Sequence, residues 1–170
     1  SISGPSRANL LTGKHSHING KVNNSDRFDG SQQTVQGLMQ NAGYQTAMIG
    51  KWHLGGTPTG FDYWEILPGQ GNYYEPDFIT ESGTNRESGY VTDLITDKSI
   101  HWLDSQRDKE NPFLMFVHHK AAHRNWMPKL EDLYAYEDRT FPVPENFFDD
   151  FEGREAAAGH EMGIDKHMTF

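Results

Sequence analysis

The sequence predicts an α/β fold in which helices alternate with the strands of a parallel or mixed sheet. Segments with the spacing of amphipathic helices are followed by short apolar runs that are typical of buried strands. Glycine and proline stand singly between these segments, and no internal repeat or low-complexity linker is present. The 170 residues are enough for one domain with a real core. Helix alternating with buried strand is the pattern of a sheet layered with helices.

The first predicted helix begins near Pro5, because proline suits the first turn of a helix, where its missing N–H costs no hydrogen bond. Residues 6–11 continue the helix, and Thr12-Gly13 ends it. Ser3 is therefore expected at the mouth of this helix.

A second helix is expected over 34–41, and a short strand over 45–49. Gly43 between them suits the left-handed backbone that ends many helices. The apolar residues of this helix recur at helical spacing: Val35, Leu38 and Met39.

A third helix is expected from an apolar stripe over 91–102, followed by a buried strand over 112–117. Beyond it, 127–150 is rich in proline, tyrosine and acidic residues, and its periodicity is weak. We predict that this stretch is mostly loop, with one short helix near 130–136. A last helix is expected over 152–162, which contains three adjacent alanines.

Composition and charge exclude several classes of protein. Lys and Arg number 15 against 24 Asp and Glu, and the net charge of −9 argues against a nucleic-acid partner. No apolar run approaches the roughly 18 residues of a membrane span, and the first residues lack the basic-then-apolar pattern of a leader. Because the chain has no cysteine, any metal must be held by histidine, carboxylate or amide oxygen.

The start of the first predicted helix carries the first candidate site. A serine at a helix N-terminus faces free backbone N–H groups and the positive end of the helix dipole, where an oxyanion binds well. Arg7 follows Ser3 by four residues and shares its helix face. Alone, the two residues also fit an N-cap serine and a surface arginine. The whole run over 3–13, Ser-Gly-Pro-Ser-Arg-Ala-Asn-Leu-Leu-Thr-Gly, resembles the sulfatase signature.

This resemblance implies that position 3 is the nucleophile. In sulfatases the residue there is oxidised after translation to formylglycine, whose hydrated aldehyde attacks sulfur. The resemblance also implies that Ser3 gives one ligand to the metal and that Arg7 holds the nucleophile. A formylglycine-generating or serine-oxidising maturation enzyme is then a required partner. Serine at this position fits either a naturally serine-type enzyme or a cysteine replaced to trap substrate.

A second candidate site is the run Gly-Lys-Trp-His-Leu-Gly over 50–55, at the end of a predicted strand. If the extended backbone persists past Ile49, Lys51 and His53 project from one face, so both can reach one oxyanion. Alone, the run also fits a solvated lysine and a packed histidine in a turn. It resembles the sulfatase segment whose lysine contacts the sulfate and whose histidine supports the nucleophile. That resemblance implies the same roles for Lys51 and His53.

The third candidate site is a polar cluster after the strand predicted over 112–117. His123 matches the sulfatase histidine that contacts the scissile oxygen, which implies that it protonates the leaving alcohol. A zinc site from His119 and His123 is the alternative, and their i, i+4 spacing requires a helix. Lys120 and Arg124 fit either added charge for a polyanionic sugar or ordinary surface residues.

Some aromatic residues near these motifs are candidates for contact with the substrate sugar: Tyr73, Tyr74 and Trp126. Each also fits ordinary packing, because large aromatic side chains dominate burial. His15 and His17, in the loop after the first helix, fit either the pocket or solvent. His118 is expected only to cap its strand.

Taken as a whole, the resemblance implies the α/β sandwich of the alkaline phosphatase-like superfamily, with a mixed sheet between helices. Residues 1–170 are then part of a single sulfatase catalytic domain, lacking its first strand and its C-terminal portion. A divalent metal, with calcium as the expected ion, takes most of its ligands from outside this chain. Asp149-Asp150 is interpreted as a solvated acidic face rather than as the metal-binding pair.

The implied activity is hydrolysis of a sulfate ester on a sulfated carbohydrate. Three stretches most resemble secreted bacterial sulfatases that act on glycosaminoglycans, in particular N-acetylglucosamine-6-O-sulfatases: 60–64, 67–71 and 144–150. A periplasmic or secreted location follows from that resemblance. Two alternatives stay open, a phosphodiester or phosphonate monoester hydrolase of the same superfamily and a catalytically inactive binder of sulfated glycans.

Overall fold

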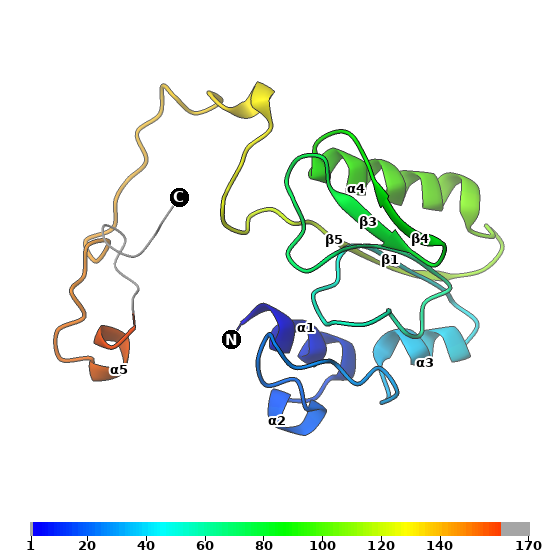
Figure 1. Ribbon diagram of the computed structural model, residues 1–170. Coiled ribbons are helices and arrows are strands. Elements are labelled where there is room, and N and C mark those ends of the chain that lie inside the picture. The colour runs from blue at the N-terminus through cyan, green and yellow to red at the C-terminus, as the bar shows by residue number, and fades with distance from the viewer. Residues whose placement is uncertain (1, 161–170) are drawn as a thin grey trace. The chain divides into compact units, whose positions relative to one another are not determined.

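The computed structural model describes residues 2–160 and divides the chain into two compact units. The first unit runs to Ala122 and contains the sheet, and the second begins at His123. Figure 1 follows the chain from blue to red. The motifs over 3–13 and 50–55 both fall in the first unit.

The first unit is built on a five-stranded sheet with the order β4-β3-β2-β1-β5 (Figure 1). The strands are β1 (Gln45–Lys51), β2 (Tyr63–Leu67), β3 (Asp77–Thr80), β4 (Gly83–Arg86) and β5 (Phe113–His118). β1 pairs in parallel with β2 and β5, whereas β3 is antiparallel to both β2 and β4. The predicted mixed sheet is therefore confirmed. The carboxyl ends of β1, β2 and β5 meet at one end of the sheet.

Helices lie on both faces of this sheet (Figure 1). On one side lie α1 (Ser3–Thr12), α2 (Ser16–Asn19) and α3 (Val35–Asn41), and on the other lies α4 (Val91–His101), which continues into the π-helix η1 (Trp102–Gln106). The alternation of side chains along β1 produces two cores. Ala47 and Ile49 belong to the core that includes α4, whereas Met48 belongs to the core that includes Ala8 and Leu11 of α1.

Local sequence sets the ends of these helices, and Gly13 and Gly43 act as predicted. α1 begins at Ser3 rather than near Pro5, and α2 forms where a loop was expected after the first helix. α1 ends at Gly13, which has a φ of 66° and donates from its N–H to the carbonyl of Asn9. α3 begins after Thr34, whose side chain accepts a hydrogen bond from the N–H of Gly37. Gly43, past the end of α3, has a φ of 88°.

The strands differ from the predictions in burial, length and number. β5 forms where predicted, but it lies at the edge of the sheet and Phe113 is 40% exposed, so the strand is not buried. An apolar run indicates a strand without fixing its place in the sheet. β1 continues past Ile49 to Lys51. The sequence did not predict β2, β3 and β4, and β4 is fully polar and exposed.

The second unit, taken by itself, is mostly loop, as predicted. It contains the 3₁₀-helix η2 (Leu130–Asp132) and the short helix α5 (Glu155–Ala158). Both are shorter than the helices expected over 130–136 and 152–162, although residues 161 and 162 lie outside the described residues. Asp149 pairs with Arg154, and Asp150 is exposed. No helix within residues 2–160 has both the length and the apolar character needed to cross a membrane.

Candidate active site

The hydroxyl of Ser3 stands at the start of α1, where two side chains contact it. His53 Nδ1 lies 3.0 Å from Oγ, and Arg7 donates from Nε to the same oxygen at 3.4 Å. Ile2, rather than Ser3, occupies the position before the helix. The alternative of an N-cap serine is therefore wrong, because Oγ faces a guanidinium and an imidazole.

The first turn of α1 does not offer the row of free N–H groups that the helix-end interpretation expected. The N–H of Gly4 donates to Asn24 Oδ1 at 2.9 Å, and the N–H of Ser6 donates to the carbonyl of Ile2. Pro5 has no N–H to offer. Anion binding beside residue 3 therefore depends mainly on side chains.

The loop over 21–26 packs against the first turn of α1 and holds it in place. The Lys21 side chain is fully buried, and its ammonium donates to the carbonyls of Asn24 and Asp26. A Cβ on Gly4 would lie 2.8 Å from Lys21 Cε and 3.0 Å from Asn24 Oδ1. The loop can approach α1 this closely because residue 4 is glycine.

Arg7 ties α1 to the ends of two strands. From Nη1 it donates to the carbonyl of Lys51 at 2.6 Å and to His118 Nδ1 at 2.8 Å. His118 Nδ1 also lies 3.2 Å from the carbonyl oxygen of Lys51, so this ring nitrogen faces both a donor and an acceptor. Burial, followed by the charge of Arg7, lowers the pKa of His118 to about 4. His118 therefore does more than cap β5, and Arg7 is not a surface arginine.

Lys51, the last residue of β1, is only 3% exposed. Burial, followed by the charges of Arg7 and Lys120, lowers its pKa to about 8. Within residues 2–160, none of these three cations forms an ion pair with an acidic side chain. We call Arg7, Lys51 and Lys120 the cationic cluster. Buried charge without a counter-charge is costly, so this cluster is suited to a bound anion.

The backbone turns sharply at His53, where φ is 54°. β1 ends at Lys51, so the expectation that Lys51 and His53 project from one extended face is wrong. The turn instead brings the His53 ring to Ser3. The second ring nitrogen, Nε2, lies 3.1 Å from Gln70 Nε2, a contact that the sequence did not predict.

Lys120, Tyr73 and Tyr74 belong to the packed interior of the first unit. Lys120 is 6% exposed, donates from Nζ to the carbonyl of Gln70 at 3.3 Å, and lies 4.6 Å from the centre of the Tyr73 ring. It is therefore not a surface residue. Tyr73 is 4% exposed and stacks on Tyr90, against which Tyr74 also packs. Packing describes both tyrosines, and the Tyr73 ring face is not open to a sugar.

A glycine brings the ends of β1 and β5 together at the site. Gly50 has a φ of 100°, and a Cβ there would lie 2.1 Å from the carbonyl oxygen of His118. This close approach places Lys51 beside His118 at the carboxyl end of the parallel strands. Ligands of α/β proteins commonly bind at that end of the sheet.

The geometry unites the first two motifs, and comparisons with known proteins decide the family. A family profile described as sulfatase matches residues 1–158. The chain is 54% identical over 99% of its length to an N-acetylglucosamine-6-O-sulfatase of Bacteroides thetaiotaomicron. This chain belongs to the sulfatase family.

More distant relatives and a solved structure agree with the assignment to the sulfatases. The N-acetylglucosamine-6-sulfatase of Homo sapiens is 29% identical over 84% of the chain. The structure of BT4656 in complex with its substrate D-glucosamine-2-N,6-O-disulfate matches with a TM-score of 0.94 and 53% identity, over 99% of this chain and 35% of that one. The expected sulfatase fold is therefore confirmed. The chain spans about a third of the length of the curated relatives it matches, 31% of the bacterial and 30% of the human protein.

The described part of this sulfatase chain does not make a complete metal site by itself. Within residues 2–160, no three His, Asp or Glu side chains are grouped to hold an ion. Calcium takes about six to eight oxygen ligands, of which Ser3 offers one. The segment after β5 that contains His119 is not helical, so the zinc alternative lacks its geometry.

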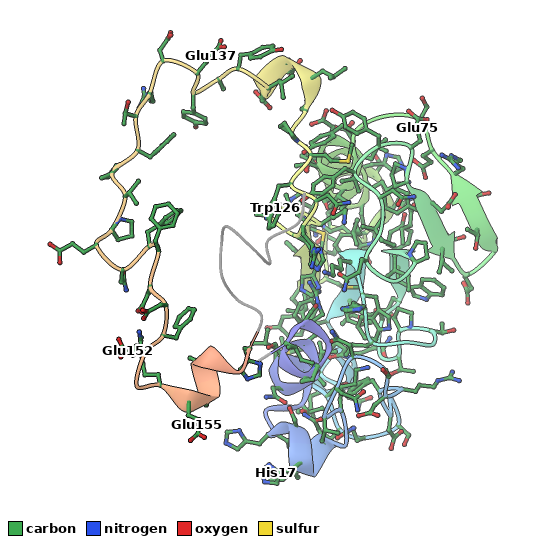
Figure 2. The ribbon with its side chains drawn as sticks, turned by 60° about the vertical axis from the view of Figure 1, so that its left-hand side comes forward. His17, Glu75, Trp126, Glu137, Glu152 and Glu155 are labelled. Atoms are coloured by element: carbon green, nitrogen blue, oxygen red, sulfur yellow. The ribbon has the colours of Figure 1, made fainter. Side chains whose placement is uncertain are left out.

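Three predicted contact residues of the sulfatase lie in the second unit: His123, Arg124 and Trp126. Within that unit, His123 Nδ1 lies 2.6 Å from the carbonyl oxygen of Arg124, and Trp126 is 39% exposed. Their contacts with substrate stay predictions. In the first unit, His15 and His17 are exposed and their rings stack, and His17 points away from the ribbon (Figure 2).

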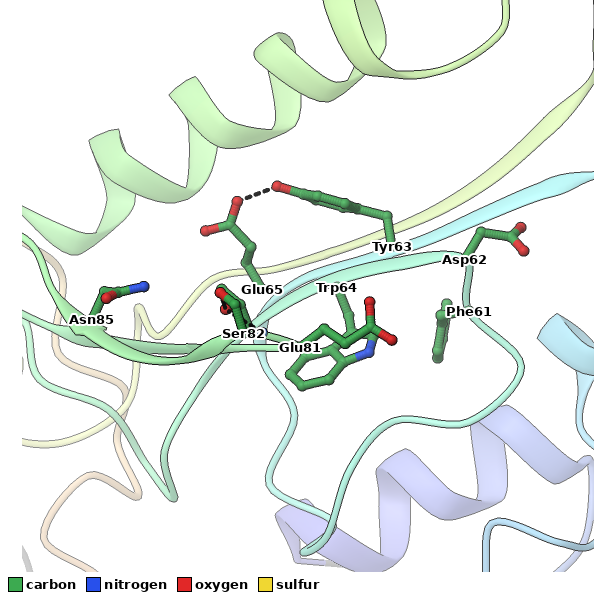
Figure 3. A pocket seen from close by; sticks show the side chains of 9 residues that line it. Phe61, Asp62, Tyr63, Trp64, Glu65, Glu81, Ser82 and Asn85 are labelled. Carbon is green, nitrogen blue, oxygen red and sulfur yellow. Dashed lines mark hydrogen bonds between the residues drawn. The ribbon is translucent and has the colours of Figure 1, made fainter.

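Two hollows border the sheet of this sulfatase. One of about 500 Å³ is lined by His53 together with Arg27, Trp52 and Pro68. The other, of about 490 Å³, is lined by Trp64 and other residues of β2 and of the β3–β4 turn (Figure 3). Of the two, only the first includes a predicted site residue, so it is the candidate approach to the site.

Proposed function

We propose that this chain is part of the catalytic domain of a sulfuric ester hydrolase. The observation that carries the proposal is the meeting of Ser3, Arg7, His53 and the buried Lys51 at one end of the sheet. A cationic cluster that has no acidic partner among residues 2–160 suits a group that is always anionic, such as a sulfate ester. The same arrangement sets an oxygen of residue 3 next to the anion.

For the substrate, we propose 6-O-sulfated N-acetylglucosamine of a glycosaminoglycan. The relative that is 54% identical is named N-acetylglucosamine-6-O-sulfatase, and BT4656 was solved with D-glucosamine-2-N,6-O-disulfate. A periplasmic or secreted location suits an enzyme that acts on such polymers.

In the active enzyme we propose formylglycine at position 3, installed by a formylglycine-generating or serine-oxidising enzyme. The hydrate of that aldehyde would supply two hydroxyls on one carbon, one to bond sulfur and one whose deprotonation re-forms the aldehyde as sulfate leaves. We further propose a divalent metal, calcium, held mostly by residues outside this chain.

The residues of the chain then have distinct roles. Arg7 and His53 hold the oxygen of residue 3 in place. Lys51, charged below about pH 8, binds the sulfate oxygens. Arg7 also holds the carbonyl of Lys51, so the nucleophile and the cation share one support. His123 gives a proton to the leaving sugar oxygen, as ester cleavage near neutral pH requires.

The test is sulfate release from 6-O-sulfated N-acetylglucosamine by the full-length enzyme, with an aryl sulfate and an aryl phosphodiester assayed in parallel. We expect release from both sulfate esters and its loss in Ser3→Ala. Faster cleavage of the phosphodiester would instead assign the phosphodiesterase alternative. If the matured protein bound sulfated glycan tightly but released no sulfate, it would be the catalytically inactive glycan binder.

A further inference from the structure

The loop over 68–72, which follows β2, reaches the site through one side chain. Gln70 Nε2 lies 3.1 Å from His53 Nε2, the ring nitrogen opposite the one that faces Ser3. In this orientation of the amide its N–H donates to His53 Nε2, which places the ring proton on Nδ1. His53 can then donate from Nδ1 to the oxygen of residue 3.

The ring of His53 is carried by an uncommon backbone conformation and is contacted at both nitrogens. Its φ of 54° is left-handed, a conformation that a residue other than glycine rarely adopts and keeps only where its surroundings impose it. The ring is held at both nitrogens, by Ser3 on one side and by Gln70 on the other. Without Gln70, the contact at Nε2 that sets the ring would be lost.

Gln70 is itself anchored in the core. Lys120 donates from Nζ to its carbonyl at 3.3 Å and packs against the buried ring of Tyr73. Gln70 Oε1 is buried and has no hydrogen-bond partner among the described residues. Leaving that oxygen unpaired costs free energy. Turning the amide over would bring Oε1 to His53 Nε2 and place the ring proton there, so the orientation of the amide and the tautomer of His53 are linked.

We propose that Gln70 is a positioning residue for the sulfatase reaction. It fixes the orientation and tautomer of His53, and so makes Nδ1 the donor to the oxygen at position 3. The kinetic consequence rests on the proposed function, whereas the placement of the His53 ring does not.

The test compares Gln70→Met and Gln70→Glu in the full-length enzyme, with Asn72→Ala as the control. Methionine keeps the length of the side chain but forms no such hydrogen bond. Glutamate keeps the shape but offers only acceptor oxygens, which would move the ring proton to Nε2. Asn72 is exposed in the same loop. The readouts are kcat, the inhibition constant of inorganic sulfate, thermal unfolding and a crystal structure of each variant.

We expect both Gln70 variants to lower kcat by about tenfold or more, the size of loss seen when a partner that orients a functional histidine is removed. Gln70→Met should leave the inhibition constant of inorganic sulfate and the thermal unfolding unchanged, and Asn72→Ala should keep the wild-type kcat. In the crystal structure of Gln70→Met, the His53 ring should leave its place beside the oxygen of residue 3.

Wild-type kcat in Gln70→Met would overturn the proposal, and so would full rescue by Gln70→Glu. Parallel losses of kcat, sulfate affinity and thermal stability would also overturn it, because they describe a purely structural residue. If the wild-type enzyme released no sulfate at all, the proposed function would fail. The crystal structures would then test the positioning role of Gln70 by themselves. An unmoved His53 in Gln70→Met would then contradict the positioning role, and a displaced ring would support it.

Discussion

Burial lowers the pKa of Lys51 and so links its protonation to the binding of an anion. The ammonium leaves water at the end of β1 and lies near two other positive charges, so it holds its proton less tightly than an exposed lysine does. A bound sulfate has the opposite effect, because a nearby negative charge favours the charged form of lysine. Anion binding and protonation of Lys51 are therefore coupled.

Affinity for inorganic sulfate is expected to fall as the pH rises through about 8. Below that value Lys51 is charged in the free enzyme, and above it the side chain must first take up a proton. The inhibition constant of sulfate, measured against pH, tests this. Lys51→Arg stays charged and should show no such fall. A wild-type inhibition constant that stays flat from about pH 7 to 10, across the interval between the lowered and the ordinary lysine pKa, would contradict the assignment.

Lys51→Ala is expected to lower turnover by about 10²–10³, the usual cost of losing one positioned donor in a desolvated pocket. His15→Ala is the matched control, because His15 is an exposed basic residue of the same unit. Steady-state kinetics of the full-length enzyme measure both variants. Equal losses would mean that the run over 50–55 has been misinterpreted.

The sequence predicted the residues of the site that lie in compact motifs, and it missed those that support them. Ser3, Arg7, Lys51 and His53 come from two short runs with recognisable spacing. The missed residues are His118 and Gln70, whereas Lys120 was left open between added charge for a sugar and an ordinary surface residue. Their contacts join segments far apart in the chain, such as Arg7 and His118, which are 111 positions apart. No local sequence pattern indicates such a contact.

At the level of elements, local signals predicted α1, α3 and α4, but they missed α2, where a loop was expected, and three of the five strands. Capping residues act within one turn, so Thr34 and Gly13 mark helix ends in the sequence itself. A strand is completed by its neighbours, so the short and polar β4 has no signal of its own. The placement of β5 at the sheet edge was missed for the same reason.

Gly50→Ala is expected to destabilise the protein more than Gly43→Ala. Both positions are left-handed, with φ of 100° and 88°. A Cβ at residue 50 would lie 2.1 Å from a backbone oxygen of β5, whereas one at residue 43 meets nothing within 4 Å. The difference in unfolding free energy between the two variants isolates the steric clash at residue 50, which we expect to cost about 2 kcal/mol or more. Urea unfolding followed by circular dichroism measures both variants, and equal losses would contradict the close approach of β1 and β5.

At the scale of the whole molecule, the chain contributes one part of a sulfatase site. The cationic cluster and Ser3 lie in the first unit, and His123 lies in the second. The described residues place Ser3, the proposed nucleophile, beside Arg7 of the cationic cluster, and they do not supply a complete set of metal ligands. Activity is therefore a property to be sought in the full-length enzyme.

The chain of 170 residues is expected to bind calcium weakly on its own, because residues 2–160 bring together no group of three acidic or histidine ligands. Isothermal titration calorimetry of that chain with calcium measures this. A single tight calcium site on this chain would contradict the expectation, because the described residues are not arranged as a metal centre.

Residue 3 is the proposed nucleophile, and an ordinary serine there is expected not to complete a turnover. A serine hydroxyl is a weak nucleophile. Serine sulfate also lacks the second hydroxyl through which sulfate leaves. The most direct measurement is the turnover of 6-O-sulfated N-acetylglucosamine by enzyme batches whose oxidised fraction at position 3 is known from peptide mass spectrometry. We predict that turnover rises in proportion to the oxidised fraction and vanishes without it, whereas full turnover by enzyme with unmodified serine at position 3 would contradict the claim.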